Sequence, residues 1–484
     1  MAVLQLLFNS FQYLIFLPLV VLVYFLLAPR YRWVLLLAAS YYFYMSWRAE
    51  YALLILFCTA INYFAAILID KAESRARKRA ILTIDLIISF GVLFVYKYLG
   101  FLTNNLNSML HAFHAAWQIP TFEILLPVGI SFFTFQTLSY TIDVYRGETE
   151  VERHFGIFAL FVSFFPQLVA GPIERSSNLL PQFRVQKRFD MPRAMAGLRI
   201  ILWGLFKKMV IADRLAVLAN AVYNDVSAHS GAAFVIATVA FAFQIYGDFS
   251  GYSDIAIGSA KILGFDLMEN FRRPYFSKTT AEFWRRWHIS LSTWFRDYVY
   301  IPLGGSRRGK LRYTFNNMLT FGLSGLWHGA EWTFVIWGLL NGVYTCLSHT
   351  TRALRERVCA RVFSARTAWL HRTLQVAVTF FLICFSWIFF RANSLADAWY
   401  VLTHLLPLDL GGVLASFGKW DLLTSFALLA LFLAAEFFSR GDTAPARLFY
   451  RRRSVRYACY LLLFVLIMMF GVTGNEIAFI YFQF

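Results

Sequence analysis

Residues 9–29, NSFQYLIFLPLVVLVYFLLAP, contain no aspartate, glutamate, lysine or arginine. A membrane-spanning helix needs about 20 mostly apolar residues, so this run is long enough to cross a bilayer. Similar runs recur along the whole chain, which excludes a single anchor and predicts an all-α polytopic membrane protein with about 11–13 membrane helices. The other runs with no charge, or with one acidic residue, are 33–47, 51–69, 80–96, 124–142, 155–173, 226–247, 313–330, 332–351, 373–390, 422–438 and 457–475.

The composition agrees with this interpretation. Hydrophobic residues make up 59% of the 484 residues and charged residues 15%, whereas soluble domains have about 45–50% and about 25%. A net charge of +18 would suggest nucleic-acid binding in a soluble protein. In a membrane protein, however, basic loops orient the adjoining helices so that the loops lie on the cytoplasmic side. We therefore expect no nucleic-acid partner. No internal repeat or long linker divides the chain, which predicts a single membrane-embedded domain over residues 1–484.

The cations are unevenly placed, and their positions predict a topology. Five clusters hold 35 of the 45 lysines and arginines, at 71–79, 184–214, 272–312, 352–372 and 440–456. Placing the clusters in the cytoplasm puts both termini outside. Three runs lie between residues 79 and 184, and this odd number predicts that one of them is re-entrant. Irregular backbone at membrane depth is tolerated only where it lines a cavity, so we expect a cavity in the middle of the chain.

His328 lies in the stretch GLSGLWHGA between two uncharged runs. A titratable group in an apolar hairpin is costly to bury. His328 is therefore either a packing residue whose hydrogen-bonding groups are satisfied or a functional residue. Small residues around it, such as Gly325 and Gly329, would let backbones and a ligand approach closely. An imidazole in such a site stays neutral at pH 7 and acts as a base.

His288 follows a helix start in the stretch TTAEFWRRWH. Thr279 and Glu282 have the spacing of a capping box. The residues that follow form an apolar stripe at helical spacing, which predicts one amphipathic helix at the cytoplasmic interface, with Arg285 and Arg286 facing lipid headgroups. His288 lies one residue off this stripe and is a second candidate for the site. The members of the stripe are Trp284, Trp287, Leu291, Trp294 and Tyr298.

Two carboxylates and an aromatic terminus complete the candidates. Asp248 and Asp254 stand in an apolar segment and need partners if they are buried. They could hold a polar network around a broken helix or take part in catalysis. The chain ends in FIYFQF, which includes Tyr481. At a random terminus such residues are typical of an aromatic belt at the membrane interface.

Three ordered stretches resemble the signature of membrane-bound O-acyltransferases. They are FSGYSDIAIG at 249–258, EFWRRWHISLSTW at 282–294 and LWHGA at 326–330. Further stretches resemble the bacterial polysaccharide branch of that family, typified by alginate O-acetyltransferases. They are LPVGISF at 126–132, IDVYRG at 142–147 and FFPQLVAGPI at 164–173. The resemblance runs from about residue 7 to the C-terminus.

The resemblance implies a ring of membrane helices around a central pore, with funnels from both faces. His328 matches the family's invariant histidine and His288 its second histidine position. The C-terminal stretch resembles a terminal motif of this branch, which would make Tyr481 the carrier of the acyl group. We also expect a role in substrate binding for a further set of residues near these positions. They are Trp287, Trp327, Asp254, Asp248, Arg285 and Arg286.

The resemblance also implies substrates and partners. The donor would be a cytoplasmic thioester, acetyl-CoA by expectation, with no bound cofactor and no metal. The acyl group would leave across the inner membrane of a bacterium, through a periplasmic acyltransferase partner beside a polysaccharide synthase and secretion machinery. Alginate, cellulose, peptidoglycan and other exopolysaccharides remain open as the polymer. Glu331 occupies a position that is often a neutral amide in relatives, and its charge would perturb His328 if it faced the pore.

Two alternatives stay open at this point. The first is a transporter or flippase that moves an acyl or polymer substrate without acyl chemistry, with buried Asp248 and Asp254 coupling to ions. The second keeps the enzyme but takes the acyl group from an acyl-carrier protein, which would dock on the basic cytoplasmic face. Consumption of a thioester separates the transporter from both enzymes.

Overall fold

The computed structural model describes residues 6–114, 117–121, 124–169, 171–307, 309–406, 408, 412–438, 453–472 and 479–480. Its regular elements are helices, and no strand occurs in these ranges, which confirms the all-α class. The chain divides into two compact units. Unit 1 comprises Met1–Ile201 and Ser253–Met268, and unit 2 comprises Leu202–Tyr252 and Glu269–Phe484. Two of the three boundaries, at 201/202 and 252/253, fall inside helices, and the single domain over 1–484 stays a prediction.

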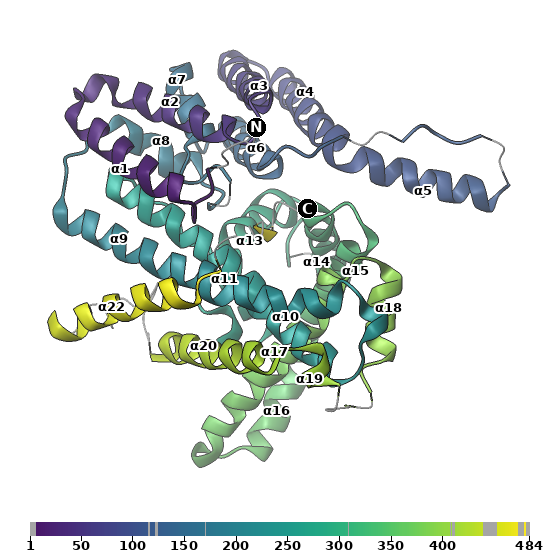
Figure 1. Ribbon diagram of the computed structural model, residues 1–484. Helices are drawn as coiled ribbons and strands as arrows, with labels where there is room; N and C mark the ends of the chain where they lie inside the picture. Colours follow the sequence, from purple (N-terminus) through teal and green to yellow (C-terminus); the bar gives the residue numbers. More distant parts are fainter. Residues whose placement is uncertain are drawn as a thin grey trace. The chain divides into compact units, whose positions relative to one another are not determined.

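Unit 1 is built from antiparallel apolar helices and their connections (Figure 1). The first helix is capped by Ser10, whose hydroxyl accepts a hydrogen bond from the amide of Tyr13 at 3.2 Å. In chain order the helices are α1 (Phe11–Leu26), α2 (Arg32–Met45), α3 (Tyr51–Lys71), α4 (Arg75–Leu93), α5 (Leu99–Ala112), α6 (Ile130–Arg146), α7 (Phe155–Ser163) and α8 (Ser176–Arg184). A π-helical turn, Phe94–Tyr98, joins α4 to α5.

Unit 2 carries the histidine-bearing segments. It begins within α9 (Met191–Leu205) and includes most of α11 (Ala232–Leu263), which is its most deeply buried long helix. The other helices are α10 (Asp213–Tyr223), α12 (Thr280–Arg286), α13 (Ile289–Phe295), α14 (Gly309–His328), α15 (Trp332–Thr350), α16 (Arg352–Val362), α17 (Ala368–Arg391), α18 (Leu395–Thr403), α19 (Val413–Ser416), α20 (Lys419–Phe438) and α22 (Arg453–Phe470). A π-helical segment, Phe206–Ala212, joins α9 to α10.

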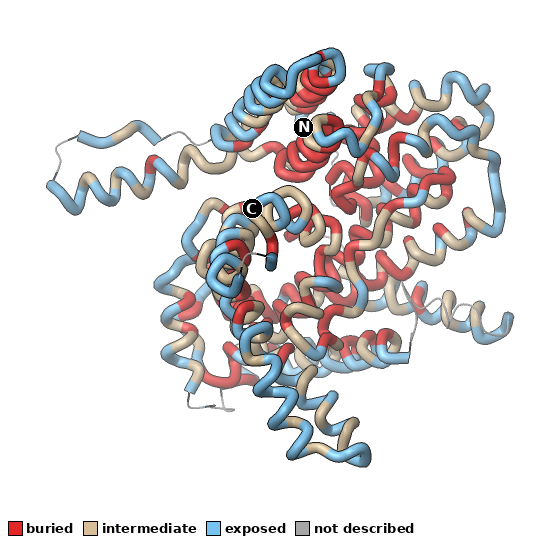
Figure 2. Tube along the Cα trace, turned by 180° about the vertical axis from the view of Figure 1, so that it is seen from behind, coloured by how far each residue is buried: buried red, intermediate tan, exposed pale blue. Residues whose placement is uncertain are grey.

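Six helices in the described part of the chain are long and apolar enough to cross a membrane, so the chain is a multi-pass membrane protein. Many of their large apolar side chains point outward, as lipid-facing residues do. The six helices differ in burial, since α11 is mostly buried and α22 is exposed along most of its length. Helix α16, which is not one of the six, is also exposed along most of its length (Figure 2). Other predicted runs form shorter helices such as α2 and α6. The count of 11–13, the ring and the pore therefore stay predictions.

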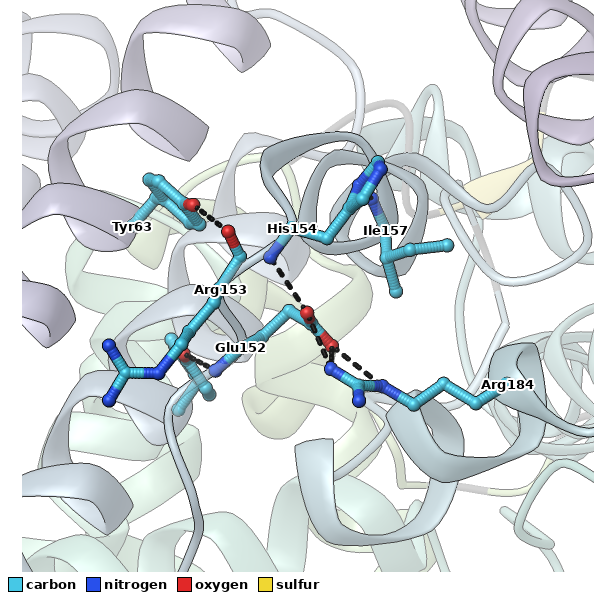
Figure 3. Close-up of polar contacts among 7 residues, drawn as sticks. Tyr63, Glu152, Arg153, His154, Ile157 and Arg184 are labelled. Atoms are coloured by element: carbon cyan, nitrogen blue, oxygen red, sulfur yellow. Dashed lines mark hydrogen bonds and ion pairs between the residues drawn. The ribbon is translucent and has the colours of Figure 1, made fainter.

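The segment around α7 returns to the place where it starts. Glu152, just before α7, forms an ion pair of 2.7 Å with Arg184 at the end of α8 (Figure 3). The nine residues of α7 span only about 14 Å, whereas the hydrocarbon core is about 30 Å thick. The helical part of the run 155–173 is thus too short to cross, and the residue Glu152 before it lies next to Arg184 at the end of α8. This geometry is compatible with a re-entrant segment between residues 79 and 184, which stays a prediction.

Candidate active site

His328 is the last residue of α14 and is 3% exposed. Its ring lies edge-on to Trp337 at a centroid distance of 5.0 Å and to Phe390 at 5.4 Å. Trp327, the preceding residue, lies 5.0 Å from it. The imidazole is therefore surrounded by aromatic rings, which exclude water from it.

Close packing of α14 against α15 holds this histidine in place (Figure 1). A Cβ atom on Gly325 would collide with the carbonyl of Phe334, and one on Gly338 would collide with the carbonyl of Phe321. The two helices can therefore touch backbone to backbone only because glycine stands at the crossing. This confirms that small residues near His328 let the two backbones approach closely, whereas the close approach of a ligand stays a prediction.

His288 stands between α12 and α13 rather than within one helix. Thr279 does cap α12, as predicted, since its hydroxyl accepts a hydrogen bond from the amide of Glu282 at 3.1 Å. The single amphipathic helix predicted beyond it is wrong. His288 has φ of +41°, in the left-handed region, which ends one helix and starts the next. The predicted interfacial stripe is likewise wrong, because Trp287, Leu291 and Trp294 are 1–3% exposed.

The strained backbone at His288 is fixed by its neighbours. The amide of Ile289 donates a hydrogen bond to the carbonyl of Asn270 at 2.9 Å, and the hydroxyl of Ser290 donates to the Asn270 side chain at 2.6 Å. Burial lowers the pKa of His288 to about 3. Its imidazole is accordingly neutral near pH 7.

The two histidines lie together in unit 2. Their ring centroids are 6.4 Å apart, and Trp327 lies 6.0 Å from His288. The ring of Phe249 on α11 lies edge-on to His288 at 4.6 Å. We call His288, His328 and these aromatic neighbours the histidine site. Two imidazoles in a dry aromatic setting suit proton transfer from a hydroxyl that attacks a carbonyl.

A buried ion network borders the histidine site through α11. Asp248, the residue before Phe249, forms an ion pair of 2.8 Å with Lys208, and Lys208 forms a second pair of 2.8 Å with Asp213. All three side chains are at most 5% exposed. Asp248 therefore has the cationic partner that its burial requires. The sequence carried a signal for this partner, because Lys208 is one of three cations, with Arg199 and Lys207, in the largely apolar stretch 195–211.

The C-terminal segment binds to this network. The backbone amide of Ile480 donates a hydrogen bond of 2.8 Å to Oδ2 of Asp248. The ring of Phe479 lies 4.3 Å from that of Tyr252 and 5.8 Å from that of Phe249, which also contacts His288. Residues 479 and 480 are thus attached beside the histidine site. Tyr481, the next residue in the sequence, lies outside the described residues.

A family model for the membrane-bound O-acyltransferase family matches residues 154–392, a range that includes both histidines. The chain is 40% identical to the probable alginate O-acetylase AlgI of Azotobacter vinelandii, over 88% of this chain and 82% of that protein. The chain belongs to the membrane-bound O-acyltransferase family. It is also 40% identical to the AlgI of Pseudomonas aeruginosa, over 86% and 75% of the two chains. A peptidoglycan O-acetyltransferase of Helicobacter pylori is 36% identical, over 84% and 80%.

The remaining residues predicted for the site of this O-acyltransferase have different surroundings. Trp287 is 1% exposed and packs against Phe283 and Trp387 in the core of unit 2. Arg286 forms an ion pair with Glu282 on its own helix, whereas Arg285 is exposed.

Asp254 falls in the part of α11 that belongs to unit 1. Glu331 is exposed, and its effect on His328 stays a prediction. Among the described residues, no three metal-binding side chains lie together.

Replacing Lys208 with methionine should destabilise this O-acyltransferase strongly. The substitution removes the cation between Asp213 and Asp248 and leaves two buried carboxylates uncompensated, which costs about 3–5 kcal/mol. Thermal unfolding of the purified protein in detergent measures the effect. Lys261→Met is the matched control, because Lys261 pairs with an Asp266 side chain that is 73% exposed, and such exposed pairs contribute about 0–1 kcal/mol. Equal stability of the two variants would contradict a structural role for the buried network.

Proposed function

We propose that this O-acyltransferase acetylates an extracytoplasmic polysaccharide. In this proposal it lies in a bacterial inner membrane with both termini outside, and it takes the acetyl group from a cytoplasmic thioester, acetyl-CoA. The cation clusters support this orientation. The names of the relatives, alginate O-acetylase and peptidoglycan O-acetyltransferase, support an acetyl donor and a polysaccharide acceptor. The transport alternative is disfavoured, because the family is one of acyltransferases.

The observation that carries the mechanism is the attachment of Ile480 to Asp248 beside two buried histidines. We place Tyr481 as the nucleophile. Its phenol oxygen attacks the thioester carbonyl while His328 accepts the phenol proton. The carbon–sulfur bond breaks, and the departing thiolate takes that proton from His328. The products are an acetyl-tyrosine and a free thiol.

The second half of the proposed reaction passes the acetyl group outward. A hydroxyl of a periplasmic acyltransferase partner, or of the polymer itself, attacks the acetyl-tyrosine ester, and the phenol oxygen takes up the proton that this hydroxyl loses. A phenol has a pKa near 10, so it leaves more readily than an alkyl alcohol does. Water would hydrolyse the intermediate, and the aromatic walls around His328 exclude it. His288, whose imidazole is neutral near pH 7, orients the reacting groups next to His328.

Thioester turnover tests the proposed donor. The purified full chain in lipid nanodiscs is mixed with acetyl-CoA, and the released thiol is measured with a thiol reagent. We expect release of CoA together with a mass increase of one acetyl group on the C-terminal peptide. Release only from an acetylated carrier protein would replace acetyl-CoA by the carrier as donor. The absence of acetylation on the peptide despite CoA release would contradict the tyrosine intermediate.

A further inference from the structure

A polar cavity lies in unit 1 and is lined only by residues of that unit. It has a volume of about 260 Å³ and lies between the α1–α2 connection and the segment that follows α8. Pockets that enclose a whole small molecule measure roughly 300–1,000 Å³, so this one suits a single headgroup. Its lining residues are Tyr24, Pro29, Arg30, Arg32, Trp33, Leu36, Phe183, Arg184, Val185, Gln186, Lys187 and Phe265.

The cavity is strongly basic. Four cations line it, and none of the described residues in its lining is a carboxylate. Arg184 is neutralised from outside the lining by Glu152, at 2.7 Å. Burial and the nearby Arg193 guanidinium lower the pKa of Lys187, and the carboxylate of Asp266, which does not line the cavity, offsets this effect only in part. An anionic group would relieve this repulsion.

The walls of the cavity are tied together by Arg32. Its guanidinium donates hydrogen bonds to the carbonyls of Leu27 at 3.1 Å and Lys187 at 2.5 Å, which join the α1–α2 connection to the segment after α8. The ammonium group of Lys187 lies over the ring of Phe265 at 5.3 Å. Arg32 and Arg184 thus have structural partners, whereas Arg30 and Lys187 are the cations best placed to bind a ligand.

The position of the cavity indicates the source of the anion. Helix α1 exposes a row of leucines that ends beside the cavity, with Leu22 59% and Leu26 76% exposed. In a membrane protein such side chains contact acyl chains, and the first cation, Arg30, follows within four residues. The boundary between apolar and basic residues is the level at which lipid phosphates lie.

We propose that this cavity binds the phosphate of an anionic phospholipid, with Arg30 and Lys187 as its ligands. Basic pockets at the edge of a membrane helix bind such headgroups, and each lysine or arginine near the surface contributes about 1 kcal/mol. Removing both cations should therefore weaken binding about 30-fold. The neighbouring leucines favour a lipid over a soluble phosphate, since a lipid also covers their apolar surface.

Lipid titration of the delipidated full-length protein tests the proposal. Native mass spectrometry counts bound phosphatidylglycerol and, separately, phosphatidylcholine for the natural protein and for the double variant R30Q/K187Q. The control variant R77Q/K78Q removes two cations of α4 that do not line the cavity. We expect R30Q/K187Q to lose phosphatidylglycerol binding and the control to keep it, with unchanged thermal unfolding in both.

Three outcomes would overturn the proposal. Equal loss in both double variants would indicate a general charge effect, and equal binding of the two lipids would show that the headgroup is not recognised. Complete displacement of phosphatidylglycerol by excess inorganic phosphate would assign the cavity to a soluble phosphate. If R30Q/K187Q unfolds at a lower temperature, Lys187→Gln alone is measured, with about a fivefold loss expected.

Discussion

The His328→Ala variant should lose acetyl transfer by about 10²–10⁴-fold, the usual contribution of a positioned general base. The reason is that the imidazole of His328 is buried among the rings of Trp327, Trp337 and Phe390, where it can accept a proton away from water. The measurement is release of CoA from acetyl-CoA by the purified protein, normalised to the amount of folded enzyme.

A matched variant keeps this result interpretable. His111→Ala removes an exposed histidine from the end of α5 and should leave the rate unchanged. Thermal unfolding is recorded for both, because deleting a buried ring also leaves a cavity. A folded His328→Ala protein with the natural rate would remove this residue from the mechanism and leave His288 as the candidate base.

The Tyr481→Phe variant should also lose most of its activity, with polymer acetylation reduced at least about 100-fold. The change removes only the phenol oxygen and keeps an aromatic ring at the position. The bond from the backbone amide of Ile480 to Asp248 does not involve that oxygen, so the attachment of the terminal segment should persist. The acetyl group would then lack its nucleophile, since phenylalanine carries none.

The control for this variant is Tyr457→Phe, which removes another hydroxyl near the C-terminus from a side chain that is 60% exposed on α22. Acetylation of the polymer is measured in cells, and acetylation of the C-terminal peptide in purified protein. Natural activity in Tyr481→Phe would refute the covalent intermediate, and the direct attack of a sugar hydroxyl would replace it. The interfacial role of the aromatic terminus would then suffice to explain Tyr481.

Local chemistry along the chain was enough to determine several features of this protein. Long uncharged runs predicted an all-α membrane protein because each must satisfy its own backbone hydrogen bonds in lipid. The helix cap at Thr279 and the close helix packing at the glycines near His328 could be predicted from the sequence, because both depend on residues a few positions apart. The odd number of runs between residues 79 and 184 predicts a re-entrant segment, and the ion pair of Glu152 with Arg184 is compatible with that prediction.

Tertiary structure decided the features that depend on distant residues. Helical periodicity continued one helix through His288, but the contacts of Asn270 hold that residue in a left-handed conformation. Asp248 pairs with Lys208 and accepts a hydrogen bond from Ile480, which is 232 positions away, and neither contact follows a spacing rule. A buried charge demands a partner, but the sequence does not specify which one, because that partner is set by packing between helices that are far apart along the chain.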